Sequence, residues 1–144
     1  MVVREVIEVA APPERSWAYV SDFTTAAEWD PGIVSSRRTS GAPAQVGSTY
    51  EVVAEFRGKH QTFSYRVTEV VQGRRLVLVG EGAKARSTDT ITFEPAGGGT
   101  RIAYEADLTL KGLYRVAEPF LGGTFRKLAR QALAGLESRL DTPA

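Results

Sequence analysis

The sequence contains no cysteine and a single histidine, His60. A chain without cysteine can form no disulfide, thiolate metal site or thiol nucleophile, and one histidine cannot build a histidine-rich metal site or a two-histidine mechanism. We therefore expect neither a metal nor a cofactor. His60 follows a predicted turn at Gly58-Lys59, so we interpret it as a surface residue rather than a general acid or base.

An excess of charge of one sign and long apolar runs are also missing. The 18 basic and 17 acidic residues leave a net charge of +1, so no global field attracts nucleic acid. No segment approaches the roughly 18 apolar residues of a membrane span. Arg4 and Glu5 stand where a secretory signal needs its apolar run. We expect a cytoplasmic protein without nucleic acid or integral membrane partners, and the sequence leaves its oligomeric state open.

The order of the expected elements is the most informative feature that is present. The 144 residues predict one domain over 1–144. A strand at 3–9 precedes a short helical segment that begins at Pro12-Pro13 and continues to Asp30-Pro31-Gly32. Six strands and one long helix over about 113–140 follow. A sheet curled around one long helix encloses a cavity, and small apolar ligands occupy such cavities.

Turn residues and alternating side chains predict a meandering antiparallel sheet. A two-residue turn at Gly58-Lys59 sets Ala54 opposite Phe63 and Glu51 opposite Arg66. Turns at Gln72-Gly73 and around Gly97-Gly98-Gly99 set the remaining hairpins. The cross-strand pairs expected there are Val67 with Leu78, Asp89 with Ala106, Ile91 with Tyr104, Phe93 with Ile102, and Glu94 with Arg101.

The C-terminal segment has apolar residues at three- and four-residue steps, which predicts a helix with one buried face. Pro119 and Gly122-Gly123 lie in its first half, where we expect a kink or a local loosening. Arg126, Lys127 and Arg130 fall on the polar side, and we interpret this basic cluster as a solvated face.

Three segments and the final helix resemble one family over nearly the whole chain. These are residues 7–17 (IEVAAPPERSW), 29–33 (WDPGI) and 67–76 (VTEVVQGRRL), together with Leu133, Leu136 and Glu137 in the last helix. The chain resembles the START/Bet v 1-like (SRPBCC) superfamily, in its polyketide cyclase/dehydrase-like branch. The resemblance implies an α+β helix-grip fold. A seven-stranded antiparallel sheet would curl around the long C-terminal helix, with two short helices after the first strand and a pocket between sheet and helix.

Asp89 is the best candidate for a catalytic residue or a ligand anchor. The predicted register places it on the inner face of its strand, where an apolar cavity would raise its pKa and suit it to act as acid or base. The alternative is that this strand end is solvated, or that Lys84, Arg86 or Arg126 neutralises the carboxylate.

The other candidate ligand-binding residues share a predicted position on the cavity side of the sheet or helix. Tyrosine hydroxyls there could bond a ligand oxygen, while the remaining side chains form an apolar wall and lid. Plain core packing is the alternative explanation for each of them. Phe120 and Thr124 are preferred to Leu133 because they flank the expected interruption of the helix. The full set is Tyr50, Phe56, Phe63, Tyr65, Ser87, Asp89, Ile91, Tyr104, Leu113, Phe120 and Thr124.

Three functions remain open at this point. The leading one is binding of a small hydrophobic or amphipathic molecule, such as a lipid, an isoprenoid or a polyketide-like aromatic, in the internal cavity. The second is a cyclase, aromatase or dehydratase of polyketide type that uses Asp89 and the tyrosines to move protons. The third is a non-catalytic, chaperone-associated interaction module, although the predicted outer face shows no large apolar patch.

Overall fold

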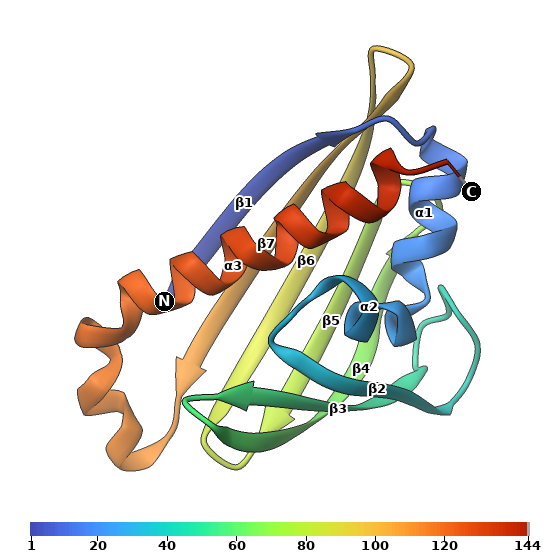
Figure 1. The fold of residues 1–144 in the computed structure, drawn as a ribbon. Coiled ribbons are helices and arrows are strands. Elements are labelled where there is room, and N and C mark those ends of the chain that lie inside the picture. The colour runs from blue at the N-terminus through green and yellow to red at the C-terminus, as the bar shows by residue number, and fades with distance from the viewer. Residues whose placement is uncertain (144) are drawn as a thin grey trace.

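The computed structural model of the chain describes residues 1–143. A strand and three short helical segments come first, then six strands, a 3-10 helix and one long α-helix (Figure 1). In chain order the elements are β1 (Val2–Val9), α1 (Pro13–Ser21), η1 (Phe23–Thr25), α2 (Ala26–Trp29), β2 (Ile33–Ser40), β3 (Thr49–Phe56), β4 (Lys59–Val71), β5 (Arg75–Gly82), β6 (Ala85–Ala96), β7 (Gly99–Leu110), η2 (Gly112–Ala117) and α3 (Glu118–Asp141).

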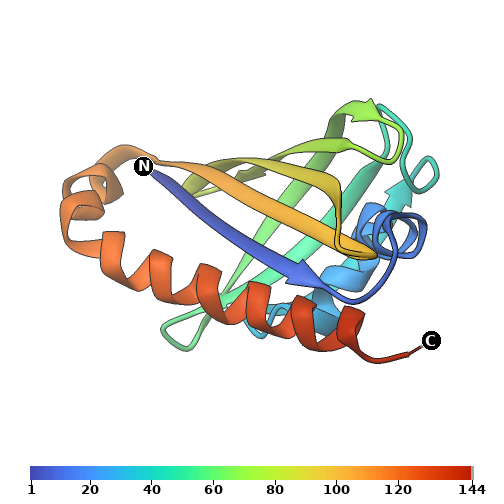
Figure 2. The same ribbon diagram turned by 90° about the horizontal axis from the view of Figure 1, so that it is seen from above.

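The seven strands form one antiparallel sheet in the order β1-β7-β6-β5-β4-β3-β2. The sheet curls, and α3 runs along its open side next to β1 (Figures 1 and 2). The short helices α1 and α2 close the end of the sheet beside the C-terminal part of α3, while η2 lies at the opposite end (Figure 1). The predicted helix-grip architecture is confirmed.

The register of the later hairpins is confirmed. Val67 pairs with Leu78, and the β6–β7 hairpin forms every pair expected of it, including Asp89 with Ala106. Side chains alternate between the two faces of a strand, so this register turns Asp89 inward. The carboxylate is therefore held by a long, continuously paired hairpin rather than by a loop.

The predicted pairing of β3 with β4 was wrong by two residues. The turn residues are Arg57 and Gly58, not Gly58-Lys59, and both have positive φ angles of 53° and 78°, as a type I′ turn requires. Every pair is displaced by two residues from the prediction: Phe63 faces Val52, and Glu51 faces Ser64. Because two is the side-chain period of a strand, the inward face stays the same.

The predicted start of the final helix, at about residue 113, was also wrong. Helix α3 begins only at Glu118 and includes Gly122-Gly123 without a break. Pro119 lies in its first turn, where the missing N–H breaks no helical hydrogen bond and the fixed φ favours the helix. The preceding residues form the separate 3-10 helix η2. The proline that was expected to kink the helix instead marks its N-terminus.

The interior is packed with large side chains under α1 and α2. The Trp17 ring packs edge-on against Phe93 at 5.2 Å between centroids, and Leu136 of α3 is fully buried. Helix α3 approaches α2 so closely at Gly135 that a Cβ there would lie 2.0 Å from the carbonyl oxygen of Trp29. This contact fixes the C-terminal part of α3 against the sheet, while its N-terminal part spans the unfilled half.

Candidate functional site

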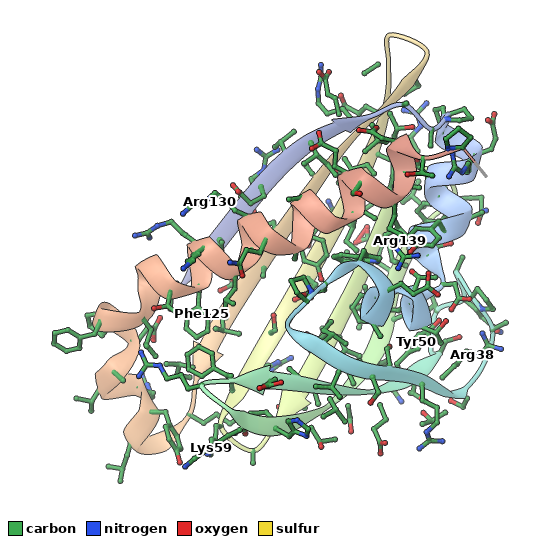
Figure 3. All side chains as sticks on the ribbon, in the orientation of Figure 1. Arg38, Tyr50, Lys59, Phe125, Arg130 and Arg139 are labelled. Carbon is green, nitrogen blue, oxygen red and sulfur yellow. The ribbon has the colours of Figure 1, made fainter. Side chains whose placement is uncertain are left out.

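A cavity of about 560 Å³ lies between the sheet and the N-terminal half of α3. Its mouth is formed by the β3–β4 turn with Arg57 and Lys59, the β5–β6 turn with Lys84, and η2. Figure 3 shows Phe125 pointing from α3 toward the hairpin that carries Lys59. The Phe125 ring stacks on Phe56 at 5.5 Å and so covers part of the gap between helix and sheet. The volume is in the range of small-molecule sites.

The cavity is open because small residues line it at positions where large ones would fill the core. Ala54 of β3, Ala106 of β7 and Ala129 of α3 all line it. Each leaves room for several heavy atoms that a leucine or phenylalanine would occupy. The remaining lining is mostly apolar, so the energetic gain on binding comes from burial of a ligand's apolar surface.

The inner end of the cavity is polar and centres on Asp89, which is 4% exposed. Its position on β6 is four residues from Ala85 at the mouth, or about 13 Å along the strand. The carboxylate accepts hydrogen bonds from the hydroxyls of Ser87 and Tyr104, and a long one of 3.5 Å from Tyr65. None of the ion pairs within residues 1–143 includes Asp89.

Glycine positions one of these donors. Gly80 of β5 pairs with Tyr65 of β4, and a Cβ on Gly80 would lie 2.5 to 2.8 Å from three carbons of the Tyr65 ring. The phenol therefore lies over the bare glycine and reaches toward Asp89. With alanine at this position, the ring would have to move away from the strand.

Burial raises the pKa of Asp89, and the three hydroxyl donors offset part of that increase by stabilising the carboxylate. Burial and the nearby Asp89 charge hold the pKa of Tyr65 and Tyr104 well above the usual value, so both phenols stay protonated. A second carboxyl, Asp30, also lines the cavity. Burial raises its pKa to about 6, helped by the Asp89 charge and opposed by a 2.8 Å hydrogen bond from the Gly32 N–H.

The raised pKa of Asp30 predicts a specific pH dependence of stability. The folded state binds this proton more tightly than the unfolded state, so ionisation of Asp30 destabilises the fold as pH rises from about 4 to about 6. In Asp30→Asn this loss is absent, and the amide oxygen can still accept the Gly32 hydrogen bond. We expect the variant's stability relative to wild type to rise over this interval by at most about 3 kcal/mol.

Urea unfolding of both proteins at about pH 4 and about pH 7.5 measures this difference. Parallel pH profiles would contradict the assignment of a raised pKa to Asp30. Asp22→Asn is the matched control, because this aspartate also accepts a backbone hydrogen bond after a short helix but does not line the cavity.

Five of the sequence-predicted ligand-binding residues line the cavity: Phe56, Phe63, Tyr65, Asp89 and Tyr104. Ser87 is buried and does not line the cavity, but its hydroxyl donates a hydrogen bond to Asp89, which does. Tyr50 and Ile91 are fully buried in the core and do not line the cavity, and the Tyr50 ring packs edge-on against Phe23 of η1.

The predicted helical lid is displaced by the late start of α3. Leu113 and Phe120 are 89% and 84% exposed, and neither they nor Thr124 line the cavity. Tyr114 of η2 and Leu121 of α3 line it instead.

Several lining residues were missed by the sequence prediction. Leu121, Phe125, Leu128 and Ala132 follow one another at helical steps, and Leu133, ranked lower in the sequence prediction, also lines the cavity. If the helix is taken to begin at Pro119, the 3.6-residue repeat of apolar side chains identifies the face of α3 that lines the cavity. Asp30 was interpreted only as part of the Asp30-Pro31-Gly32 helix stop, and nothing local in the sequence marks its carboxyl as facing a cavity.

Solved structures similar to this one cover nearly its whole length. A protein from Thermus thermophilus superposes with a TM-score of 0.84 at 22% identity, over 97% of both chains. A START superfamily protein from Mycobacterium smegmatis gives 0.75 at 22% identity, over 97% of both chains. The aromatase/cyclase ZhuI from a Streptomyces species gives 0.82 at 11% identity, over 98% of this chain and 93% of that one. At such identities the likeness concerns the fold.

No protein with a curated description matches the sequence. A family model described as "Polyketide cyclase / dehydrase and lipid transport" matches residues 1–141. The match includes every strand, both ends of α3 and all the residues around Asp89. The chain therefore belongs to the polyketide cyclase/dehydrase and lipid transport family.

Proposed function

We propose that this protein binds a small hydrophobic or amphipathic molecule, such as a lipid, an isoprenoid or a polyketide-like aromatic, in the cavity between sheet and α3. The observation that carries the proposal is an apolar cavity of about 560 Å³ whose inner end holds the buried, hydrogen-bonded carboxyl of Asp89. An apolar body would be held by burial against the lining, and a single polar group would be held at Asp89.

The donors at the inner end favour a ligand with a hydroxyl or ketone oxygen. The Tyr65 hydroxyl is only loosely engaged with Asp89, at 3.5 Å, so it can turn to a ligand oxygen. The indole N–H of Trp29, another lining residue, is buried without an acceptor in residues 1–143. A carboxylate or phosphate at this end would face Asp30 and Asp89, and like charges in a buried site repel.

Native mass spectrometry of the protein purified from its own host tests this function, followed by extraction of any bound molecule. The expected result is a retained apolar molecule with one oxygen function. A clean ligand-free mass, together with no thermal shift across a library of hydrophobic compounds, would contradict the proposal.

Tyr104→Phe is expected to weaken binding of an oxygen-bearing ligand and to spare its deoxy analogue. The substitution leaves the ring but removes the hydroxyl of a lining residue, which donates to Asp89 and can accept a hydrogen bond from a ligand hydroxyl. Loss of one such hydrogen bond costs about 1 kcal/mol, or roughly a fivefold change in Kd. Titration of both ligands into wild type and variant measures the difference, and an equal loss for the two ligands would show that the hydroxyl only supports packing.

Enzymatic cyclisation or dehydration is the second candidate function, because Asp89 and two protonated phenols form a buried proton-transfer group. A carboxyl with a raised pKa can accept a proton from carbon and return it to oxygen, while a tyrosine donates to a developing enolate. The test is turnover of a poly-β-ketone substrate by wild type and Asp89→Asn. If the variant turns over as fast as wild type, Asp89 has no catalytic role.

A further inference from the structure

We infer that the cavity mouth docks on an anionic phospholipid bilayer through an apolar surface made of Leu113, Val116 and Phe120. The three side chains are 89%, 73% and 84% exposed. Leu113 and Val116 are three residues apart in a 3-10 helix, which places them on one side, and Phe120 follows four residues later in α3.

The segment that carries these exposed residues also has apolar side chains on its cavity side. Tyr114, Ala117 and Leu121 alternate with the exposed residues and line the cavity. Residues 112–121 therefore separate the cavity from solvent with apolar side chains on both sides. A water-facing lid would carry polar residues outside, since exposed large apolar clusters mark interaction sites.

Charge around the mouth identifies the partner. From Lys111 to Arg130 there are five basic residues and a single acid, Glu118. The two turns that complete the mouth add Arg57, Lys59 and Lys84. Glu55 also lines the cavity and Glu81 forms an ion pair with Lys111, so basic residues still outnumber acidic ones around the mouth. The β5–β6 turn lies against the docking segment, because Lys84 Nζ lies 5.1 Å from the centre of the Tyr114 ring and the Lys84 carbonyl accepts the Lys111 N–H. Exposed apolar side chains can insert among the lipids of an anionic membrane, while the surrounding basic side chains bind its head groups.

The protein would dock on the membrane surface without spanning the bilayer. No helix within residues 1–143 is long and apolar enough to cross a bilayer. The benefit of docking rests on the proposed function: an apolar ligand could pass between membrane and cavity without entering water. The surface itself, and the test below, do not depend on that function.

Vesicle co-sedimentation of the full chain tests the inference. Wild type is expected to bind phosphatidylcholine vesicles with about 30% phosphatidylglycerol, to bind pure phosphatidylcholine much more weakly, and to dissociate between about 0.1 M and about 0.5 M salt. The combined variant Leu113→Ser, Val116→Ser and Phe120→Ser is expected to lose at least about tenfold in partitioning. Its side chains are exposed, so an unchanged thermal melt is expected and shows that it folds.

The matched control is Val46→Ser with Val71→Ser. Both valines are exposed, at 58% and 48%, but Val46 precedes β3 and Val71 ends β4, so they lie at the far ends of the strands from the mouth. Wild-type binding is expected of this control. Ligand affinity in solution, measured on the same triple variant, is expected to be unchanged, which separates membrane docking from ligand binding.

Insertion can also be observed directly, since the chain has no native cysteine to label. An environment-sensitive dye on Phe120→Cys is expected to shift to the blue with anionic vesicles, and the same dye on Val46→Cys is not. Absence of wild-type binding to anionic vesicles, or equal binding by the triple variant, overturns the inference. So does a concentration-dependent dimer that the triple variant dissociates without any vesicle binding, because the surface would then belong to a second copy.

Discussion

Replacement of Ala129 by tryptophan is expected to weaken ligand binding about a hundredfold while the protein stays folded. Ala129 lies on the face of α3 that lines the cavity, so an indole there would occupy space that the ligand needs. Loss of about 120 Å² of apolar contact at about 25 cal/mol per Å² corresponds to about 3 kcal/mol, or roughly a hundredfold in Kd. The cavity is large enough to receive the side chain, so overpacking strain is not expected.

Ala134→Trp is the control on the same helix. Ala134 is exposed on the opposite side of α3 and does not line the cavity, so its replacement adds the same bulk without filling the site. Isothermal titration with the ligand identified by mass spectrometry compares the two variants, and thermal melts establish that both fold. If Ala129→Trp binds as tightly as Ala134→Trp, the ligand does not occupy this cavity.

The inner end of the site was predictable because a long hairpin determines it. Asp89 and Tyr104 both lie in the β6–β7 pairing, where charge, turn and apolar pattern all specify one register. Tyr65 was placed on the correct face in spite of a wrong turn, since the two-residue error preserved its orientation. Local sequence is sufficient to predict which side chains face the cavity wherever an error in the strand register cannot turn them to the other face.

The mouth was not predictable in the same way. The apolar spacing of Leu113, Val116 and Phe120 is that of a buried helical face, and only the position of Pro119 indicates that the helix begins later. The true cavity face, with Phe125, depends on how α3 crosses the sheet, which is a tertiary property. An exposed apolar surface and a buried one have the same pattern in sequence, so the docking surface emerged only from the structure.

Gly135→Ala is expected to destabilise the protein, although alanine is normally the better helix former by about 1 kcal/mol. A Cβ at Gly135 would lie 2.0 Å from the Trp29 carbonyl oxygen, which is backbone and cannot move away alone. Helix α3 would have to separate from α2, at a net cost of about 1–3 kcal/mol. Because Trp29 lines the cavity, the same displacement is expected to weaken ligand binding.

Gly123→Ala in the same helix is expected to have the opposite sign. Its Cβ would meet only the flexible end of Arg126, at 3.9 Å, so the helix propensity of alanine acts unopposed and stabilises by about 0.5–1 kcal/mol. Urea unfolding of both variants measures the two free energies. Stabilisation by both would mean that α3 can shift away from Trp29, and the close contact at Gly135 would then not fix the C-terminal part of α3 against the sheet.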